Sequence, residues 1–188
     1  MPVVELPSQA AWEEWLEERH ADARGVWLKF AKKHTGVTTV NYAQALEVAL
    51  CFGWIDGQVA RFDETYYLQR FTPRTKRSKW SKLNCEHVAR LTKEGRMRAA
   101  GVAAVEAAKA DGRWDAAYDS PSRITVPDDL QQALDANPKA LAAFEQLDRQ
   151  NRYAILYRTH DAKRPETRAR RIATFVEMLE LGRKPLDR

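Results

Sequence analysis

Cations and aromatic side chains alternate along residues 66–82. Arginine guanidinium groups bind phosphates and carboxylates through paired hydrogen bonds, and aromatic faces stack on planar rings such as nucleic-acid bases. The pattern therefore predicts a surface that contacts an anionic or planar ligand. The alternative is a solvated loop whose aromatic residues anchor it to the core. The candidate ligand-binding residues are Tyr66, Arg70, Arg74, Arg77, Lys79 and Trp80.

The segment GWIDGQ, residues 53–58, lies just upstream. Its carboxylate, Asp56, is a candidate partner for Arg70 or Arg74, or a candidate general base. A general base also needs a nucleophile or an acid beside it, and the sequence identifies none, so the catalytic residues stay unknown. Trp54 and Gln58 complete this candidate set. The structural alternative is a turn, because Asp-Gly is a common turn pair.

A second cationic run, KRPETRARRI, occupies residues 163–172 at the start of an expected helix. Cations at a helix N-terminus are disfavoured by the helix dipole. This placement suggests an ion pair with the other domain, or an anion shared with the first basic segment. Arg168 and Arg171 are the candidate residues, and a solvated helix face is the alternative.

Several kinds of chemistry find no support. The chain has no GxGxxG, Walker or GxSxG motif, so we expect no cofactor. None of its four histidines has metal-ligand spacing, and we expect no metal; His34, in a polar loop, is the one we would test for catalysis. The two cysteines form no CxxC pair and are expected to be reduced. The net charge of +5 is compatible with nucleic acid or another anionic partner.

The hydrophobic periodicity predicts an α+β fold: a small mixed or antiparallel sheet with flanking helices, followed by a C-terminal helical bundle. Strands are expected at residues 3–6, 26–31, 54–55, 58–62 and 66–71, with turns at Asp56-Gly57 and Asp63-Glu64. The clearest helix starts at a capping box formed by Asn41 and Gln44 and ends at Gly53. Other helices are expected at residues 8–20, 81–95, 99–110, 128–136, 138–148, 151–160 and 165–181.

The domain organisation follows from composition. Residues 1–114 form the expected α+β domain, residues 115–126 (DAAYDSPSRITV) have the composition of a linker, and residues 127–188 are expected to be helical. No window approaches the roughly 18 apolar residues of a membrane span, and the N-terminus lacks the features of a signal peptide. We therefore expect a cytoplasmic protein with no membrane span. The sequence does not determine its oligomeric state.

Five segments together resemble the YdeI/OmpD-associated family. They are CFGWIDGQ (51–58), YYLQRFTPR (66–74), SKWSKLN (78–84), EAAKADGRWDAAYDSPS (106–122) and NRYAILYRTHDAKRPETRARRI (151–172). The resemblance implies a bacterial or archaeal bacteriocin-protection protein, linked to an outer-membrane porin and to resistance against cationic antimicrobial peptides. Members of the family are often described as predicted periplasmic. The family brings no established catalytic residues.

Three functional hypotheses follow. The first is a non-enzymatic accessory protein for stress or antimicrobial-peptide resistance that binds a protein partner; it predicts an exposed apolar patch near the C-terminal bundle. The second is a nucleic-acid or phosphate-ligand binding protein that uses the basic-aromatic segment, residues 66–82; it predicts that the two basic runs converge. The third is an enzyme of unrecognised type centred on Asp56, which acts with Arg70, Arg74 and a tyrosine; it predicts a pocket that holds these groups within hydrogen-bond reach.

Overall fold

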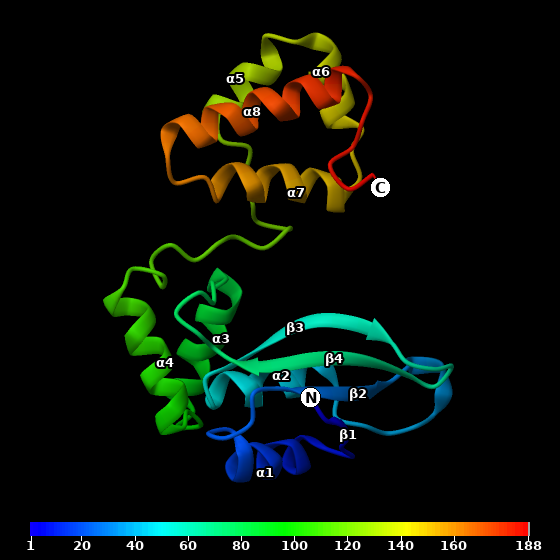
Figure 1. The fold of residues 1–188 in the computed structure, drawn as a ribbon, viewed down its shortest axis with the longest axis vertical. Coiled ribbons are helices and arrows are strands. Elements are labelled where there is room, and N and C mark those ends of the chain that lie inside the picture. The colour runs from blue at the N-terminus through cyan, green and yellow to red at the C-terminus, as the bar shows by residue number, and fades with distance from the viewer. Residues whose placement is uncertain (188) are drawn as a thin grey trace. The chain divides into compact units, whose positions relative to one another are not determined.

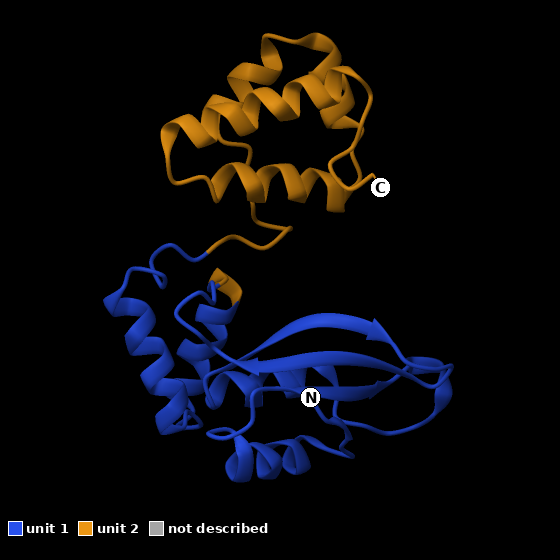
Figure 2. Cartoon of the chain, in the orientation of Figure 1, with its two compact units in different colours: residues 1–80, 84–117 blue, residues 81–83, 118–188 orange. Residues whose placement is uncertain are grey.

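The computed structural model describes residues 1–187 and divides into two compact units. The N-terminal unit comprises residues 1–80 and 84–117, and the C-terminal unit comprises residues 81–83 and residues from 118 onward (Figure 2). Residues 81–83 belong to the second unit because Ser81 forms a β-bridge with Tyr118 and Lys82 forms an ion pair with Asp119. Residues 115–117 of the Pro/Ser-containing segment therefore fall in the first unit and residues 118–126 in the second.

The N-terminal unit contains the predicted mixed sheet, of four strands in the order β1-β2-β4-β3. β1 and β2 are parallel, whereas β4 is antiparallel to both β2 and β3. The strands are β1 (Val3–Glu5), β2 (Val26–Ala31), β3 (Trp54–Arg61) and β4 (Tyr66–Pro73).

Helices α1 and α2 pack with the apolar face of the sheet to form the core. Helices α3 and α4 lie at one end of the sheet (Figure 1). The Nε1 of Trp12 on α1 donates a hydrogen bond to the carbonyl of Ala45 on α2, 3.1 Å away. The Trp12 ring also packs on Phe71 of β4, with the ring centroids 5.6 Å apart. The helices of this unit are α1 (Gln9–Arg19), the 3-10 turn η1 (Lys33–Thr35), α2 (Tyr42–Cys51), α3 (Lys82–Lys93) and α4 (Ala99–Ala110).

Side chains cap the start of two helices, and one of these caps, the capping box of Asn41 and Gln44, was predicted. Ser8 Oγ accepts a hydrogen bond from the amide of Ala11 at the start of α1. Asn41 and Gln44 form both halves of the capping box that begins α2. Each side chain satisfies a backbone group that the first helical turn leaves unpaired.

The predicted turn at Asp56-Gly57 is wrong, because β3 continues through it as one strand. The register of β3 against β4 shifts between Asp56 and Val59, which places a bulge where the turn was expected. The side-chain amide of Gln69 donates to the carbonyl of Gly57, 2.8 Å away, and so satisfies an oxygen that the shifted ladder leaves unpaired. A glycine inside a strand commonly marks such a bulge.

The true hairpin turn lies at Asp63, where the weaker of the two turn signals was found. One carboxylate oxygen of Asp63 accepts hydrogen bonds from the amides of Thr65 and Tyr66, at 2.8 and 2.7 Å. This local side-chain bonding reverses the chain between β3 and β4.

Within the described residues, the C-terminal unit consists of four helices around a hydrophobic core without tryptophan. Leu130, Leu134, Phe144 and Ile155 are fully or almost fully buried there. The chain turns at Asp148 because its carboxylate accepts from the amide of Asn151 and caps the next helix, so the third helix of the bundle begins earlier than predicted. The helices are α5 (Asp128–Asp135), α6 (Pro138–Glu145), α7 (Arg149–His160) and α8 (Pro165–Glu180).

Within residues 1–187, none of these helices has the length and apolar character needed to cross a membrane.

Candidate functional site

The two faces of β4 separate the candidate residues as strand alternation requires. Phe71 is fully buried in the core, and Tyr67 stacks on Phe30 with the ring centroids 5.4 Å apart. Tyr66 and Arg70 lie on the opposite face of the sheet and are half-buried. Only this second pair is therefore turned away from the core.

Tyr66 is part of a polar cluster on that face. Its hydroxyl donates to Glu5 on β1 at 2.7 Å, and Lys29 of β2 donates to the same carboxylate at 3.3 Å. The Lys29 ammonium also lies 4.8 Å from the centre of the Tyr66 ring. The hydrogen bond from Tyr66 lowers the pKa of Glu5 and raises the pKa of the tyrosine. The Tyr66 hydroxyl therefore stays protonated and joins two strands of the sheet.

Arg70 lies across the β3 bulge. A Cβ atom at Gly57 would come within 3.3 Å of the Arg70 Nε, so the bulge glycine leaves room for the guanidinium. That Nε is buried and has no hydrogen-bond partner within residues 1–187. Trp27 faces Arg70 across the β2–β4 pair. The arginine is thus held by packing.

Asp56 does not form the expected pair with Arg70 or Arg74. Its carboxylate accepts a hydrogen bond from the Tyr42 hydroxyl of α2, 2.9 Å away, and forms no ion pair within the described residues. Trp54 is 1% exposed and donates through Nε1 to the carbonyl of His20, so its ring belongs to the core. Gln58 is exposed at the bulge.

The basic segment forms a turn after β4, here called the 74–79 loop, which two arginines hold in place. The Arg74 guanidinium lies 3.4 Å from the centre of the Trp80 ring and donates to the carbonyl of Lys79 at 3.0 Å. Trp80 is 1% exposed and packs against Trp114, with the ring centroids 4.9 Å apart. Arg74 and Trp80 therefore anchor the loop to the core.

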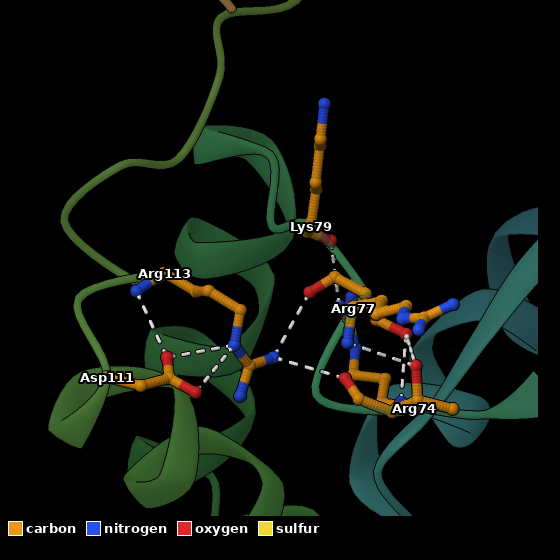
Figure 3. A network of polar contacts seen from close by, with 7 residues as sticks. Arg74, Arg77, Lys79, Asp111 and Arg113 are labelled. Carbon is orange, nitrogen blue, oxygen red and sulfur yellow. Dashed lines mark hydrogen bonds and ion pairs between the residues drawn. The ribbon is translucent and has the colours of Figure 1, made fainter. Parts of the chain in front are cut away.

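The second arginine, Arg113, was not predicted from the sequence. Its Nη1 donates to the carbonyls of Thr75 and Ser78 at 3.3 and 3.1 Å, while its Nε donates to Asp111 at 2.8 Å (Figure 3). Burial acts to raise the pKa of Asp111, but the hydrogen bonds from Arg113 outweigh it, and the pKa is lowered. No local pattern indicates this clamp, because Arg113 is 38 residues from Thr75 in sequence.

The remaining cations of the 74–79 loop face solvent. Lys76, Arg77 and Lys79 are exposed, and the Lys79 side chain extends away from the clamp in Figure 3. The structure therefore divides the predicted basic-aromatic surface into an anchored inner half and a solvent-facing cationic half.

Arg168 and Arg171 bind partners inside the C-terminal unit. Arg168 donates to Asp129 of α5 at 2.8 Å and to the carbonyl of Thr159 at 2.8 Å. Arg171 donates to the carbonyl of Arg158 and lies 4.0 Å from Asp161. These two arginines connect α8 to α5 and to the end of α7.

An apolar groove, here called the α5/α8 groove, lies between α5 and α8. The sequence predicted an exposed apolar patch near the C-terminal bundle but indicated none of its residues. The groove encloses about 580 Å³. The Asp129–Arg168 ion pair lies among its lining residues, and two further acidic residues of α8 also line it. The apolar and acidic residues of the groove are Ala133, Ala169, Ile172, Ala173, Val176, Glu177 and Glu180.

The thiols and imidazoles offer little further chemistry. Cys51 and Cys85 are both free, and burial raises the pKa of Cys51 to about 11, so its thiol is protonated at neutral pH. His34 is exposed in η1. Within residues 1–187, no group of three or more His, Cys, Asp or Glu side chains is arranged to hold a metal ion.

A mixed sheet backed by helices, joined in one chain to a helical unit with an apolar groove, defines a two-unit α+β protein. The chain belongs to the family described as "Domain of unknown function (DUF8412)", whose family model matches residues 4–104, more than half of the 188 residues. A second family model, "Bacteriocin-protection, YdeI or OmpD-Associated", matches residues 123–182. No curated protein and no solved structure matches the chain.

The second match confirms the family resemblance and locates it. It contains the motif of residues 151–172 and the whole α5/α8 groove. The motifs of residues 51–84 lie instead within the DUF8412 match. The chain therefore joins a YdeI/OmpD-associated domain to a second domain with its own family.

Proposed function

We propose that the protein is a non-enzymatic accessory of antimicrobial-peptide or stress resistance, and that it acts by binding a cationic amphipathic segment in the α5/α8 groove. The observation that carries this proposal is the groove itself. It is the kind of exposed apolar surface that the partner-binding hypothesis expected near the C-terminal helices, and it lies within the match to the bacteriocin-protection family.

The shape and lining of the groove suit one face of a helical or extended peptide. Its volume of about 580 Å³ is in the range of ligand sites. Ala133, Ala169 and Ala173 are small and leave room above Ile172 and Val176. An amphipathic helix binds such grooves by inserting the apolar side chains of one face.

The charges of the groove favour a cationic occupant. Asp129 is neutralised by Arg168, whereas Glu177 forms no ion pair within residues 1–187 and Glu180 accepts a hydrogen bond only from the neutral amide of Asn137. The groove therefore carries net negative charge on a chain whose overall charge is +5. A cationic peptide that the chain as a whole would repel can be attracted at this site.

The enzyme hypothesis lacks the geometry that it required. It called for Asp56, Arg70, Arg74 and a tyrosine within hydrogen-bond reach in one pocket. Asp56 is bonded to a tyrosine, Tyr42, but it forms no ion pair with either arginine within the described residues, and Arg74 is stacked on Trp80. Partner binding is therefore the function that the side-chain arrangement supports best.

The test is a titration of the full chain into a fluorescein-labelled, amphipathic Leu/Lys helical peptide, followed by fluorescence anisotropy. We expect Ala173→Arg to weaken binding at least tenfold, because the new side chain fills the groove and repels cations. The matched control is Ala142→Arg on the exposed surface of α6, which adds the same charge outside the groove. Equal affinities for the two variants would contradict the proposal.

The charge of the groove is tested separately. Glu177→Gln with Glu180→Gln should weaken the Leu/Lys peptide severalfold at low salt and less at high salt, because screening weakens exposed charge interactions. A Leu/Glu peptide of the same pattern should bind the wild-type protein more weakly than the Leu/Lys peptide does. The reverse order would exclude a cationic partner.

A further inference from the structure

We infer that the 74–79 loop of the N-terminal unit is a preformed site for the phosphodiester backbone of nucleic acid. This inference concerns a different unit from the α5/α8 groove and does not depend on the peptide proposal.

The loop is ordered before any ligand arrives. The carbonyls of Thr75, Ser78 and Lys79 accept hydrogen bonds from Arg113 or Arg74. The amide of Ser78 also donates to the Thr75 carbonyl at 3.0 Å, and the amide of Thr75 donates to the Ser78 hydroxyl at 2.9 Å. Because these groups are already fixed, binding an anion does not incur the entropic cost of ordering the backbone.

The same bonds set the electrostatic character of the loop. Three of its carbonyl oxygens accept hydrogen bonds from the guanidinium groups of Arg74 and Arg113. The partial negative charge of these oxygens is therefore balanced by the two arginines. The side chains of Lys76, Arg77 and Lys79 are left exposed to solvent. The outer surface of the loop is therefore cationic.

Lys76 and Arg77 differ from several other cations of the N-terminal unit. Arg90, Arg96 and Arg98 each form ion pairs with glutamates at 3.0 Å or less, so their charge is balanced internally. Neither Lys76 nor Arg77 has an ion-pair partner within residues 1–187. A polyanion approaching the loop would therefore meet two cationic side chains that take part in no ion pair within the described residues.

The arrangement favours phosphates over bases and over membranes. Trp80 is buried under Arg74, so the loop has no free aromatic face for base stacking, and we expect little sequence preference. Its other residues, Thr75 and Ser78, are polar, whereas membrane-surface segments need apolar side chains to insert. Closely spaced phosphates along a nucleic-acid strand match three cations within four residues.

The test is fluorescence anisotropy of fluorescein-labelled 20-nucleotide single strands and duplexes, titrated with the full chain at 50 and 200 mM NaCl. Three phosphate contacts on a duplex predict a slope of about −2.7 in log K against log salt, so the fourfold rise in salt weakens binding about 40-fold. The combined variant Lys76→Ala, Arg77→Ala, Lys79→Ala should bind at least tenfold more weakly at low salt and lose most of the slope.

The matched control removes the same charge elsewhere. Arg24, Lys33 and Lys93 are exposed in the same unit and form no ion pairs within residues 1–187, and all three are replaced by alanine. Equal losses in the two triple variants would show that only net charge matters, and would overturn the inference. Flat titrations with both strand types would overturn it as well, as would loop-dependent binding to phosphatidylglycerol vesicles without binding to oligonucleotides.

Two further readouts separate this inference from misfolding and from the peptide proposal. Trp80 lies beside the loop, so unchanged tryptophan emission in the triple variant shows that the anchored half is intact. Ala173→Arg and Ala142→Arg should bind oligonucleotides equally, because neither residue is in the N-terminal unit. A selective loss of oligonucleotide binding in Ala173→Arg would contradict the assignment to the loop.

Discussion

The two units of this protein have different kinds of core. All six tryptophans of the chain lie before residue 117, and Trp12, Trp15 and Trp54 form one cluster in the N-terminal unit, with ring centroids 5.2 to 6.4 Å apart. The C-terminal core consists mainly of leucine, isoleucine and phenylalanine on four helices. The first core therefore depends strongly on tryptophan rings, whereas the second is built from leucine, isoleucine and phenylalanine without any tryptophan.

The N-terminal unit also contains a close approach between the backbones of two helices. Gly101 of α4 lies against the carbonyl of Cys51 at the end of α2, and a Cβ atom there would be 2.1 Å from the carbonyl oxygen. Because all the tryptophans lie in the N-terminal unit, tryptophan emission reports only on the unfolding of that unit. A change in the C-terminal core should therefore leave the tryptophan signal unaltered.

The largest effect is expected from Gly101→Ala. The new methyl group would meet backbone atoms, which cannot move aside as a side chain does, so α2 and α4 must separate. We expect a loss of about 3 kcal/mol or more in the free energy of unfolding of the N-terminal unit. Urea denaturation followed by tryptophan emission measures it.

The control for this variant is Gly112→Ala. Gly112 has a φ of +76° and nothing within 4 Å of an added Cβ, so only backbone strain is introduced, at a cost of about 1 kcal/mol. A Gly101 variant that is no less stable than this control would show that α2 and α4 are not packed as described.

Leu134→Ala tests the aliphatic core. Leu134 is fully buried in the C-terminal unit, and the lost contacts and the cavity should cost about 3 kcal/mol. Far-UV circular dichroism should show part of the helical signal melting early, while the tryptophan transition stays in place. Leu181→Ala, at a residue 59% exposed, should change neither signal. A joint shift of both transitions would indicate that the two units unfold together.

Arg113→Ala should have an intermediate effect, of about 1 kcal/mol on the N-terminal unit, because hydrogen bonds to partly exposed carbonyls are lost. The more specific consequence is faster amide hydrogen exchange in residues 74–79, since the loop is no longer held. Exchange measured by mass spectrometry checks this. Arg113→Lys should not restore the protection, because an ammonium group lacks the planar fork that reaches Asp111 and two carbonyls together. Unchanged exchange in the loop would refute the clamp.

Asp129→Asn should have the smallest effect, below about 1 kcal/mol at pH 7, because the ion pair with Arg168 is partly exposed to solvent, which screens it. Hydrogen bonding from Arg168 lowers the pKa of Asp129 below its ordinary value of 3.8. The stabilisation is therefore present above pH 3.8 and is lost as the pH falls through the lowered folded-state pKa.

The corresponding measurement compares the melting temperatures of wild-type and Asp129→Asn proteins between pH 7 and pH 2.5. Their difference should disappear toward the acid end. Glu145→Gln, which removes an exposed carboxylate without an ion-pair partner within residues 1–187, should show no such trend. A difference that grows on acidification would have the wrong sign for this ion pair.

The sequence predicted correctly those helix caps and strands that depend on interactions between neighbouring residues. The capping box of Asn41 and Gln44 and the strand at residues 66–71 follow from neighbours within a few residues, and the structure confirms both. The α+β class followed in the same way from the order of strand and helix patterns.

The rest depends on contacts between distant segments. The Arg113 clamp on Thr75 and the bond from Tyr42 to Asp56 join residues 38 and 14 positions apart, and no spacing rule indicates either. The Asp56-Gly57 pair was misread because a two-residue turn and a strand bulge favour the same residues. The register shift of β3 against β4 distinguishes the two, because the strand continues through Gly57.

The β3 bulge also affects how copies of this protein behave toward one another. β3 is the edge of the sheet, and Val59 on it is 65% exposed, so a regular strand here would present an open ladder to a neighbouring chain. The register shift interrupts that ladder, and the Gly57 carbonyl is already occupied by Gln69. An irregularity that looks like a defect in the sheet thus protects the molecule from edge-to-edge aggregation when it is crowded.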